Sequence, residues 1–187
     1  GIGFDFARLT IGASDFSRSH YSLDDPPDGN PDPALRHFSI DPNRDDVIPV
    51  VQQALLINPD LKIMASPWSA PAWMKDTGSL IEGTLLPEHQ DAFARYLLAY
   101  IDAYAGQGIP IFALTVQNEP DHEPGDYPGM RLNAPERARF IAGHLGPLRD
   151  QHQPQVQSGN GPGLAGASAG LDQAAAMQRE MQRIEHR

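Results

Sequence analysis

Apolar residues along the first 147 positions fall into two kinds of segment that alternate. Short, nearly continuous apolar runs occupy residues 3–11, 61–66 and 109–116. Runs of this length with apolar residues on both faces are typical of parallel strands buried in a sheet. These three segments are therefore predicted to be strands.

Helical stripes follow each of the three runs. Asp45 is predicted to cap a helix that buries one apolar face and stops at Asn58-Pro59. A second helix is predicted over 88–105 and a third from Pro135, with a break at Gly146-Pro147. The predicted inward positions of the three helices are Ile48, Val51 and Leu55; Phe93, Leu97, Tyr100, Ile101 and Tyr104; and Ala138, Ile141 and Leu145.

The order strand–helix–strand–helix–strand–helix predicts an α/β fold with βαβ units and a parallel sheet. Loops rich in Gly, Pro and Asp follow the strands at 12–44, 75–86 and 117–133. In a βα barrel the carboxyl ends of the strands face the active site.

Residues 151–187 break this pattern. Five glycines within 158–170 predict a flexible linker, and 171–187 has the spacing of an amphipathic helix. We therefore expect one domain over 1–150 and a linker with a C-terminal helix over 151–187. We hypothesise that this second segment is out-of-frame or foreign sequence, which the encoding DNA would test.

Charge and composition narrow the function classes. The 187 residues include 14 Lys and Arg against 24 Asp and Glu, a formal charge of −10, which argues against a nucleic-acid partner. There is no Cys, so thiolate metal sites and a Cys nucleophile are excluded. We find no apolar stretch long enough for a membrane span and no signal peptide, and the sequence leaves the compartment unknown.

Glu119 is the strongest candidate for catalysis. It follows the apolar run 109–116, so we expect its carboxyl at the rim of the sheet, partly desolvated and therefore protonated near neutral pH, as a general acid must be. Asn118 offers both a donor and an acceptor to a sugar hydroxyl. The alternative for Glu119 is a helix cap or a plain strand-end carboxylate.

Four other residues are candidates for substrate binding. Arg8 lies inside an apolar strand, where a buried guanidinium needs a carboxylate or a polar ligand, and a structural ion pair is the alternative. Asp15 can accept from sugar hydroxyls or simply form a turn. Trp68 can form a flat wall for a sugar ring, whereas Trp73 is expected in the core. Tyr127 can reach a carboxylate or remain exposed in its loop.

Metal and cofactor sites are not predicted. The seven His residues include no pair at a spacing suited to a metal, and no phosphate-binding glycine motif follows a strand. We therefore expect no metal and no cofactor.

Three ordered motifs resemble the catalytic barrel of the family 30 glycoside hydrolases, most closely the glucosylceramidase branch. These are 7–17 (ARLTIGASDFS), 66–75 (SPWSAPAWMK) and 113–120 (ALTVQNEP), followed by the Tyr127-Pro128 pair. The resemblance covers about residues 1–150. It implies a partial (β/α)8 TIM barrel with about three βα units, corresponding to strands two to four.

The resemblance implies a retaining β-glucosidase acting on a glucosylceramide-like β-glucoside. Glu119 would be the acid/base, a second Glu at the end of the seventh strand would be the nucleophile, and Tyr127 would lie near the acid/base. Arg8, Asp15, Trp68 and Asn118 would line the glucose site. Members of the family are often secreted or lysosomal.

A complete barrel needs about 250 residues, so this chain carries only part of one. We expect no measurable β-glucosidase activity from it alone, and self-association through exposed sheet edges. Three alternatives remain: another family 30 activity such as β-1,6-glucanase or xylanase, a non-catalytic carbohydrate-binding or pseudogene fragment, and an interaction protein that uses 171–187.

Overall fold

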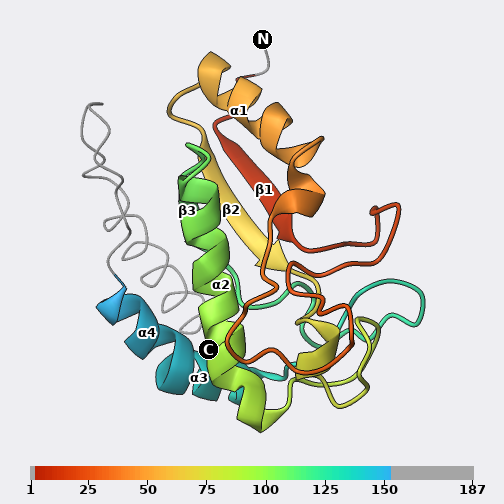
Figure 1. Cartoon of the computed structure of the whole chain (residues 1–187). Helices are drawn as coiled ribbons and strands as arrows, with labels where there is room; N and C mark the ends of the chain where they lie inside the picture. Colours follow the sequence, from red (N-terminus) through yellow and green to blue (C-terminus); the bar gives the residue numbers. More distant parts are fainter. Residues whose placement is uncertain (1–2, 153–187) are drawn as a thin grey trace.

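The computed structural model describes residues 3–152, which form a three-stranded parallel sheet with helices (Figure 1). The strands are β1 (Phe6–Ile11), β2 (Lys62–Pro67) and β3 (Ile111–Leu114), in the spatial order β1-β2-β3. Phe6 lies opposite Lys62, and Ile11 opposite Pro67. The predicted α/β fold with parallel strands is confirmed.

Helices α1 (Val47–Ile57) and α2 (Gln90–Ala105) cover one face of the sheet (Figure 1). The core forms between this face and α2, whose inward side is largely aromatic. A ring stack between Tyr100 and Tyr104, with centroids 4.2 Å apart, runs along that side. The largest fully buried side chains here are Ile63, Phe93, Tyr96, Leu97, Tyr100, Tyr104 and Ile109.

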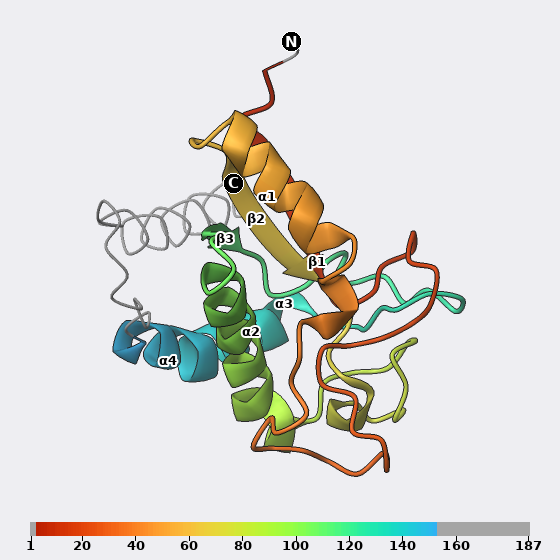
Figure 2. The same cartoon turned by 45° about the horizontal axis from the view of Figure 1, so that its top comes forward.

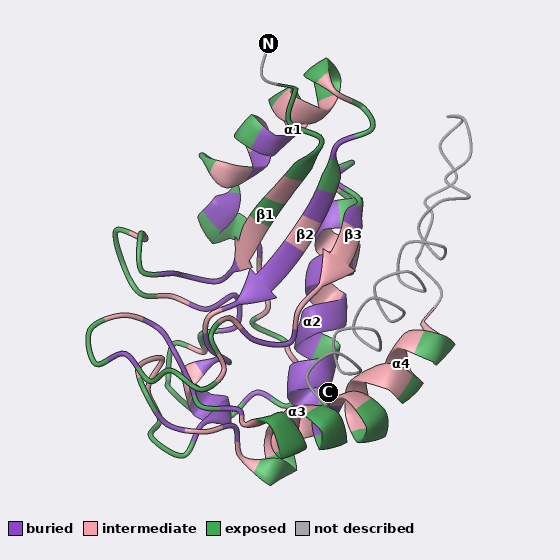
Figure 3. Ribbon diagram, turned by 180° about the vertical axis from the view of Figure 1, so that it is seen from behind, coloured by how far each residue is buried: buried purple, intermediate pink, exposed green. Residues whose placement is uncertain are grey.

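The opposite face of the sheet is open within residues 3–152 (Figure 3). Side chains alternate between faces along a strand, and in β2 buried Ile63 and Ala65 alternate with Lys62 and Met64. In β1 both Phe6 and Arg8 are exposed. The prediction that the first strand is buried on both faces was therefore wrong.

Helix α3 (Ala134–Phe140) continues through a π-helical turn (Ile141–Leu145) into α4 (Gly146–Gln151). Asn133 and Glu136 form a reciprocal capping box at its start, because each side chain accepts from the other's backbone N–H. The predicted break at Gly146-Pro147 was wrong. Pro147 has no N–H to donate, and the wide turn in front of it lets the helix continue.

Three further boundaries or positions differ from expectation. Asp46, rather than Asp45, accepts from the N–H of Val47 at the start of α1. Ala138 is exposed, and Phe140 is the buried residue of α3. The third strand, expected over 109–116, extends only over 111–114.

Pairing of β3 with β2 is irregular between Ile63 and Met64, whose partners are Ile111 and Ala113. It shifts again beyond Leu114. The Thr115 N–H donates to Ala65 O at 3.0 Å, and the Asn118 N–H donates to Pro67 O at 2.7 Å. Between these two bonds the chain after β3 advances one residue more than β2, as in a β-bulge. Residues 115–118 therefore stay attached to the sheet although they leave its regular ladder.

The loops that follow the three strands gather at one end of the sheet (Figure 2). They comprise residues 12–46, 68–86 and 115–133. No helix among the described residues has the length and hydropathy to cross a membrane. The predicted linker at 158–170 and helix at 171–187 lie outside the described residues.

Candidate functional site

The Arg8 side chain links β1 to the carboxyl end of β2 and to the segment that follows β3. One of its terminal nitrogens donates to Ser66 Oγ at 3.0 Å and to Asn118 Oδ1 at 2.5 Å. Its guanidinium carbon lies 4.8 Å from the centre of the Trp68 ring, within range of a cation–π contact. The structure therefore brings Arg8, Trp68 and Asn118, three predicted substrate-binding residues, into one cluster.

The expected environment of Arg8 was wrong in one respect. Its side chain is exposed on the open face of the sheet rather than buried. Its hydrogen-bond partners among residues 3–152 are neutral, and it forms no ion pair there. The guanidinium charge is therefore left available to an incoming ligand.

Two hydroxyls beneath Arg8 were not predicted. Ser66 is fully buried, and its Oγ forms a hydrogen bond with Thr115 Oγ1 while it accepts from Arg8. The two residues lie at adjacent strand ends, so strand-end position was the signal that could have identified them. Ser66 therefore holds the Arg8 guanidinium by a direct hydrogen bond, and Thr115 holds the Ser66 hydroxyl.

The orientation of the Asn118 amide follows from these contacts. Its oxygen accepts from Arg8, and its own backbone N–H is held by Pro67 O. A primary amide then has its NH₂ group left for other partners. The Asn118 NH₂ group is therefore available to donate to an acceptor on a bound molecule.

Glu119 is exposed, so the predicted apolar burial of its carboxyl was wrong. Its backbone has a φ of +44°, in the left-handed region that non-glycine residues rarely occupy. The carbonyl of Glu119 accepts from the His122 N–H at 2.9 Å, which closes a tight turn directly after the sheet. Strain of this kind at a strand end is frequent at functional sites.

Tyr127 lies within the electrostatic reach of several carboxylates. Loss of hydration, followed by the negative charges of Glu119, Asp15 and Asp126, raises the pKa of its hydroxyl. The hydroxyl lies 3.2 Å from His122 Nε2. Its hydrogen-bond partner among the described residues is therefore a histidine, whereas the sequence left open a carboxylate partner or an exposed position in the loop.

Asp15 is exposed in the loop after β1. It sits in a turn in which the Ser14 N–H donates to Ser17 Oγ at 2.9 Å. Its charge acts on Tyr127 across the end of the sheet. The structure is thus consistent with both interpretations of Asp15, a turn residue and a contact to substrate.

Trp73 is a core residue, as predicted, with 9% of its surface exposed. Its indole N–H donates to Asp24 Oδ2 at 3.0 Å. Burial raises the pKa of the Asp24 carboxyl to about 6, although the Trp73 hydrogen bond acts in the opposite direction. This pair fixes the long loop after β1 to the loop after β2.

The family model for the glycosyl hydrolase family 30 TIM-barrel domain matches residues 1–156. The chain belongs to this family. Its three βα units are accordingly a part of a (β/α)8 barrel, and the cluster around Arg8 lies at the barrel end that carries active sites.

Relatives with different activities in their names share the same sequence identity with the chain. The endo-1,6-β-D-glucanase neg1 of Aspergillus fumigatus is 34% identical over 162 residues, covering 79% of this chain and 33% of that protein. The mouse lysosomal acid glucosylceramidase is 34% identical over 160 residues, covering 79% and 30%. The chain therefore spans about a third of the length of these relatives.

A solved structure gives the same picture of the fold. The endo-β-1,6-glucanase BT3312 superimposes with a TM-score of 0.74 and 32% identity, covering 81% of this chain and 33% of that one. The family is shared by glucanases and glucosylceramidases. The glucosylceramidase type that the motifs suggested is therefore not distinguished from the glucanase type.

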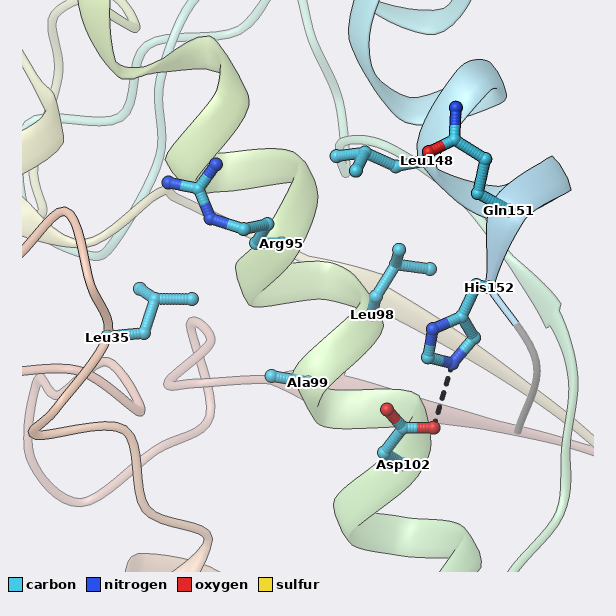
Figure 4. Close-up of a pocket in the computed structure, with 8 residues that line it drawn as sticks. All are labelled: Leu35, Arg95, Leu98, Ala99, Asp102, Leu148, Gln151 and His152. Atoms are coloured by element: carbon cyan, nitrogen blue, oxygen red, sulfur yellow. Dashed lines mark hydrogen bonds and ion pairs between the residues drawn. The ribbon is translucent and has the colours of Figure 1, made fainter. Parts of the chain in front are cut away.

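A surface depression of about 380 Å³ lies elsewhere, between α2 and α4 (Figure 4). It contains none of the predicted site residues, and its one drawn contact joins His152 Nε2 to Asp102 Oδ1 at 2.9 Å. No cluster of potential metal ligands occurs among residues 3–152. The residues that line the depression are Leu35, Arg95, Leu98, Ala99, Asp102, Leu148, Gln151 and His152.

Proposed function

We propose that this chain carries the acid/base half of a retaining β-glucosidase site. The proposal is supported by the cluster of Arg8, Trp68 and Asn118 at the end of the sheet. Asn118 directly precedes Glu119 in the sequence. Glu119 would protonate the glycosidic oxygen and later remove a proton from water. The resemblance implies a nucleophilic Glu at the end of the seventh barrel strand, about 5–5.5 Å from Glu119.

The other residues would bind the sugar. The Asn118 NH₂ group, whose orientation Arg8 fixes, would donate to a ring hydroxyl oxygen next to the reacting carbon. Trp68 would provide an apolar wall, and Asp15 would accept from sugar hydroxyls. Tyr127, held by His122, would lie beside the acid/base.

The substrate class is a β-glucoside. Glucosylceramide is the substrate that the sequence motifs favour. A β-1,6-glucan is the second candidate, because a named endo-1,6-β-glucanase and the solved structure of another are among the relatives. Both substrates present a β-linked glucose to the same strand-end cluster, so the two proposals share their site residues.

Two assays of the chain alone separate catalysis from binding. We expect no turnover of a fluorogenic β-glucoside, because one carboxyl without a nucleophile does not support the covalent route. Measurable turnover that Glu119→Gln abolishes would contradict this expectation. Sugar binding by the chain alone, together with no turnover by a barrel in which the missing strands are restored, would favour a non-catalytic carbohydrate-binding fragment.

A grafted barrel tests the catalytic proposal directly. Residues 1–150 replace the matching third of the Aspergillus glucanase, and the folded product is assayed on a β-1,6-glucan and on glucosylceramide. We expect turnover of one of them, and Glu119→Gln should lower kcat by about 10²–10⁴-fold. A folded graft whose activity is indifferent to Glu119→Gln would refute the role of this residue.

A further inference from the structure

Lys75 is a buried cation that joins two loops at the site. Only 3% of its surface is exposed. Its Nζ donates to Ser69 Oγ at 2.9 Å, to Leu80 O at 3.0 Å and to Gly129 O at 2.9 Å. An ammonium group has three N–H donors, so these three acceptors satisfy it completely.

The three acceptors belong to different stretches of the site. Ser69 follows Trp68, Leu80 lies further along the same loop, and Gly129 lies two residues after Tyr127 in the loop after β3. A second buried side chain joins the same two loops, because Gln117 Nε2 donates to Trp68 O at 2.6 Å and to Met130 O at 3.3 Å. Buried donors thus attach the Trp68 segment to the segment that follows Tyr127.

We propose that Lys75 is a positioning residue that fixes the Tyr127 loop against the Trp68 loop. An apolar side chain of the same length would fill this volume without the cost of burying an ammonium group, so space filling does not explain a lysine here. Three directed hydrogen bonds do. The inference rests on the proposed function, since that function places Trp68 and Tyr127 at the sugar, but the link itself can be tested without any ligand.

Charge gives the link a property that a neutral contact lacks. Burial lowers the pKa of Lys75 from 10.5 to about 7, against the opposing carboxylates of Asp76 and Glu82 on its own loop and Glu123 on the facing loop. In the closed form the hydrogen bonds of Lys75 are made, and in the opened form they are broken and the lysine is hydrated. The hydrated lysine of the opened form binds its proton more tightly. Between about pH 7 and 10 the closed form therefore holds a neutral amine, which keeps two N–H donors for the three acceptors, whereas the opened form stays protonated. Because the opened form alone keeps the proton, closure of the link should become more favourable as the pH rises over this range.

The test is hydrogen exchange of the Gly129 amide, which donates to Leu80 O at 3.0 Å between the same two loops, in the full chain. Lys75→Met should speed this exchange by about tenfold or more and shift the NMR signals of the Tyr127 ring and Trp68 indole. In the unsubstituted chain, protection of Gly129 should rise between about pH 7 and 10, and Lys75→Met should abolish that rise.

Two further variants keep the result interpretable. Tyr104→Phe removes a buried hydroxyl that accepts from Asn43 in the helical layer, and it should change neither Tyr127 nor the pH profile. Ser69→Ala removes one acceptor of Lys75 and should speed exchange by a few-fold even where Lys75→Met does not fold. Unchanged exchange in Ser69→Ala, or a flat pH profile in the unsubstituted chain, would overturn the proposal. A failure to bind β-glucosides would overturn only the proposed function.

Discussion

At the scale of single residues, the charge of Asp24 opposes folding. The carboxyl is fully buried, Oδ1 has no hydrogen-bond partner among the described residues, and its pKa is raised from 3.8 to about 6. The folded chain therefore binds a proton here more tightly than the unfolded chain does. The tighter proton binding stabilises the folded chain fully below pH 4, and this stabilisation is lost as the pH rises through 6.

Asp24→Asn should remove this pH dependence. The amide oxygen can still accept from Trp73, and no charge remains to be buried. We expect the variant to gain on the order of 1–2 kcal/mol of unfolding free energy at pH 7 and little at pH 4. Urea unfolding at the two pH values measures the difference, and an equal effect at both would show that the charge of Asp24 is not the cause.

The sequence identified which residues gather at the site, but it did not predict how exposed their side chains are. The motifs identified Arg8, Trp68 and Asn118, and the structure brings the three together. Burial of Arg8 and Glu119 was predicted wrongly, because the apolar pattern of a strand does not reveal which of its faces has a covering layer. Ser66 was missed because its partners come from β1 and from the segment after β3. Lys75 was missed because its hydrogen bonds depend on how its own loop folds and packs on the loop after β3.

At the scale of elements, the π-helical turn between α3 and α4 places two glycines, three positions apart, in different surroundings. A Cβ on Gly146 would lie 2.8 Å from Ile141 O, whereas a Cβ on Gly143 would meet nothing within 4 Å. The capping box at Asn133 could be read from sequence, but the wide turn could not. It depends on how the turn accommodates Pro147 within a continuing helix.

Gly146→Ala should therefore destabilise the chain, and Gly143→Ala is its matched control. We expect a loss of about 1–2 kcal/mol for the first from the forced contact, and a gain of about 0.5–1 kcal/mol for the second from helix propensity. Thermal unfolding of both variants decides the matter. Equal shifts in Tm would mean that the wide turn is absent in solution.

At the scale of the whole molecule, one layer of helices and one layer of strands leave apolar surface uncovered. Large exposed apolar residues on α1 are Val50, Leu56 and Ile57, with exposed fractions of 64%, 83% and 86%. Within the described residues β1 and β3 each pair with a strand on one side only. Unpaired strand edges and apolar patches favour association.

We therefore expect this chain to self-associate as its concentration rises. Leu56→Lys should reduce association measured by sedimentation velocity. Ala142→Lys places the same charge at an exposed helical position outside the apolar surface of α1 and should have little effect. A chain that stays monomeric at all concentrations, or equal effects of both substitutions, would argue against an interface at α1.

The parallel α/β fold followed from local patterns, because the alternation of buried runs and helical stripes determines it. Specificity within family 30 did not follow, because three of the eight βα units of a barrel form only part of the surface that contacts a substrate. The strand-end cluster is the part of the proposed sugar site that this chain carries. A β-glucoside should therefore be recognised by Arg8, Trp68 and Asn118 even without turnover.

The most direct measurement is an NMR titration of the full chain with a β-linked glucose disaccharide. We expect saturable shifts of the Trp68 indole N–H and the Asn118 side-chain amide at millimolar ligand, and Arg8→Ala should weaken binding by about tenfold. Shifts confined to the depression between α2 and α4, or no response from Trp68 and Asn118, would contradict this expectation.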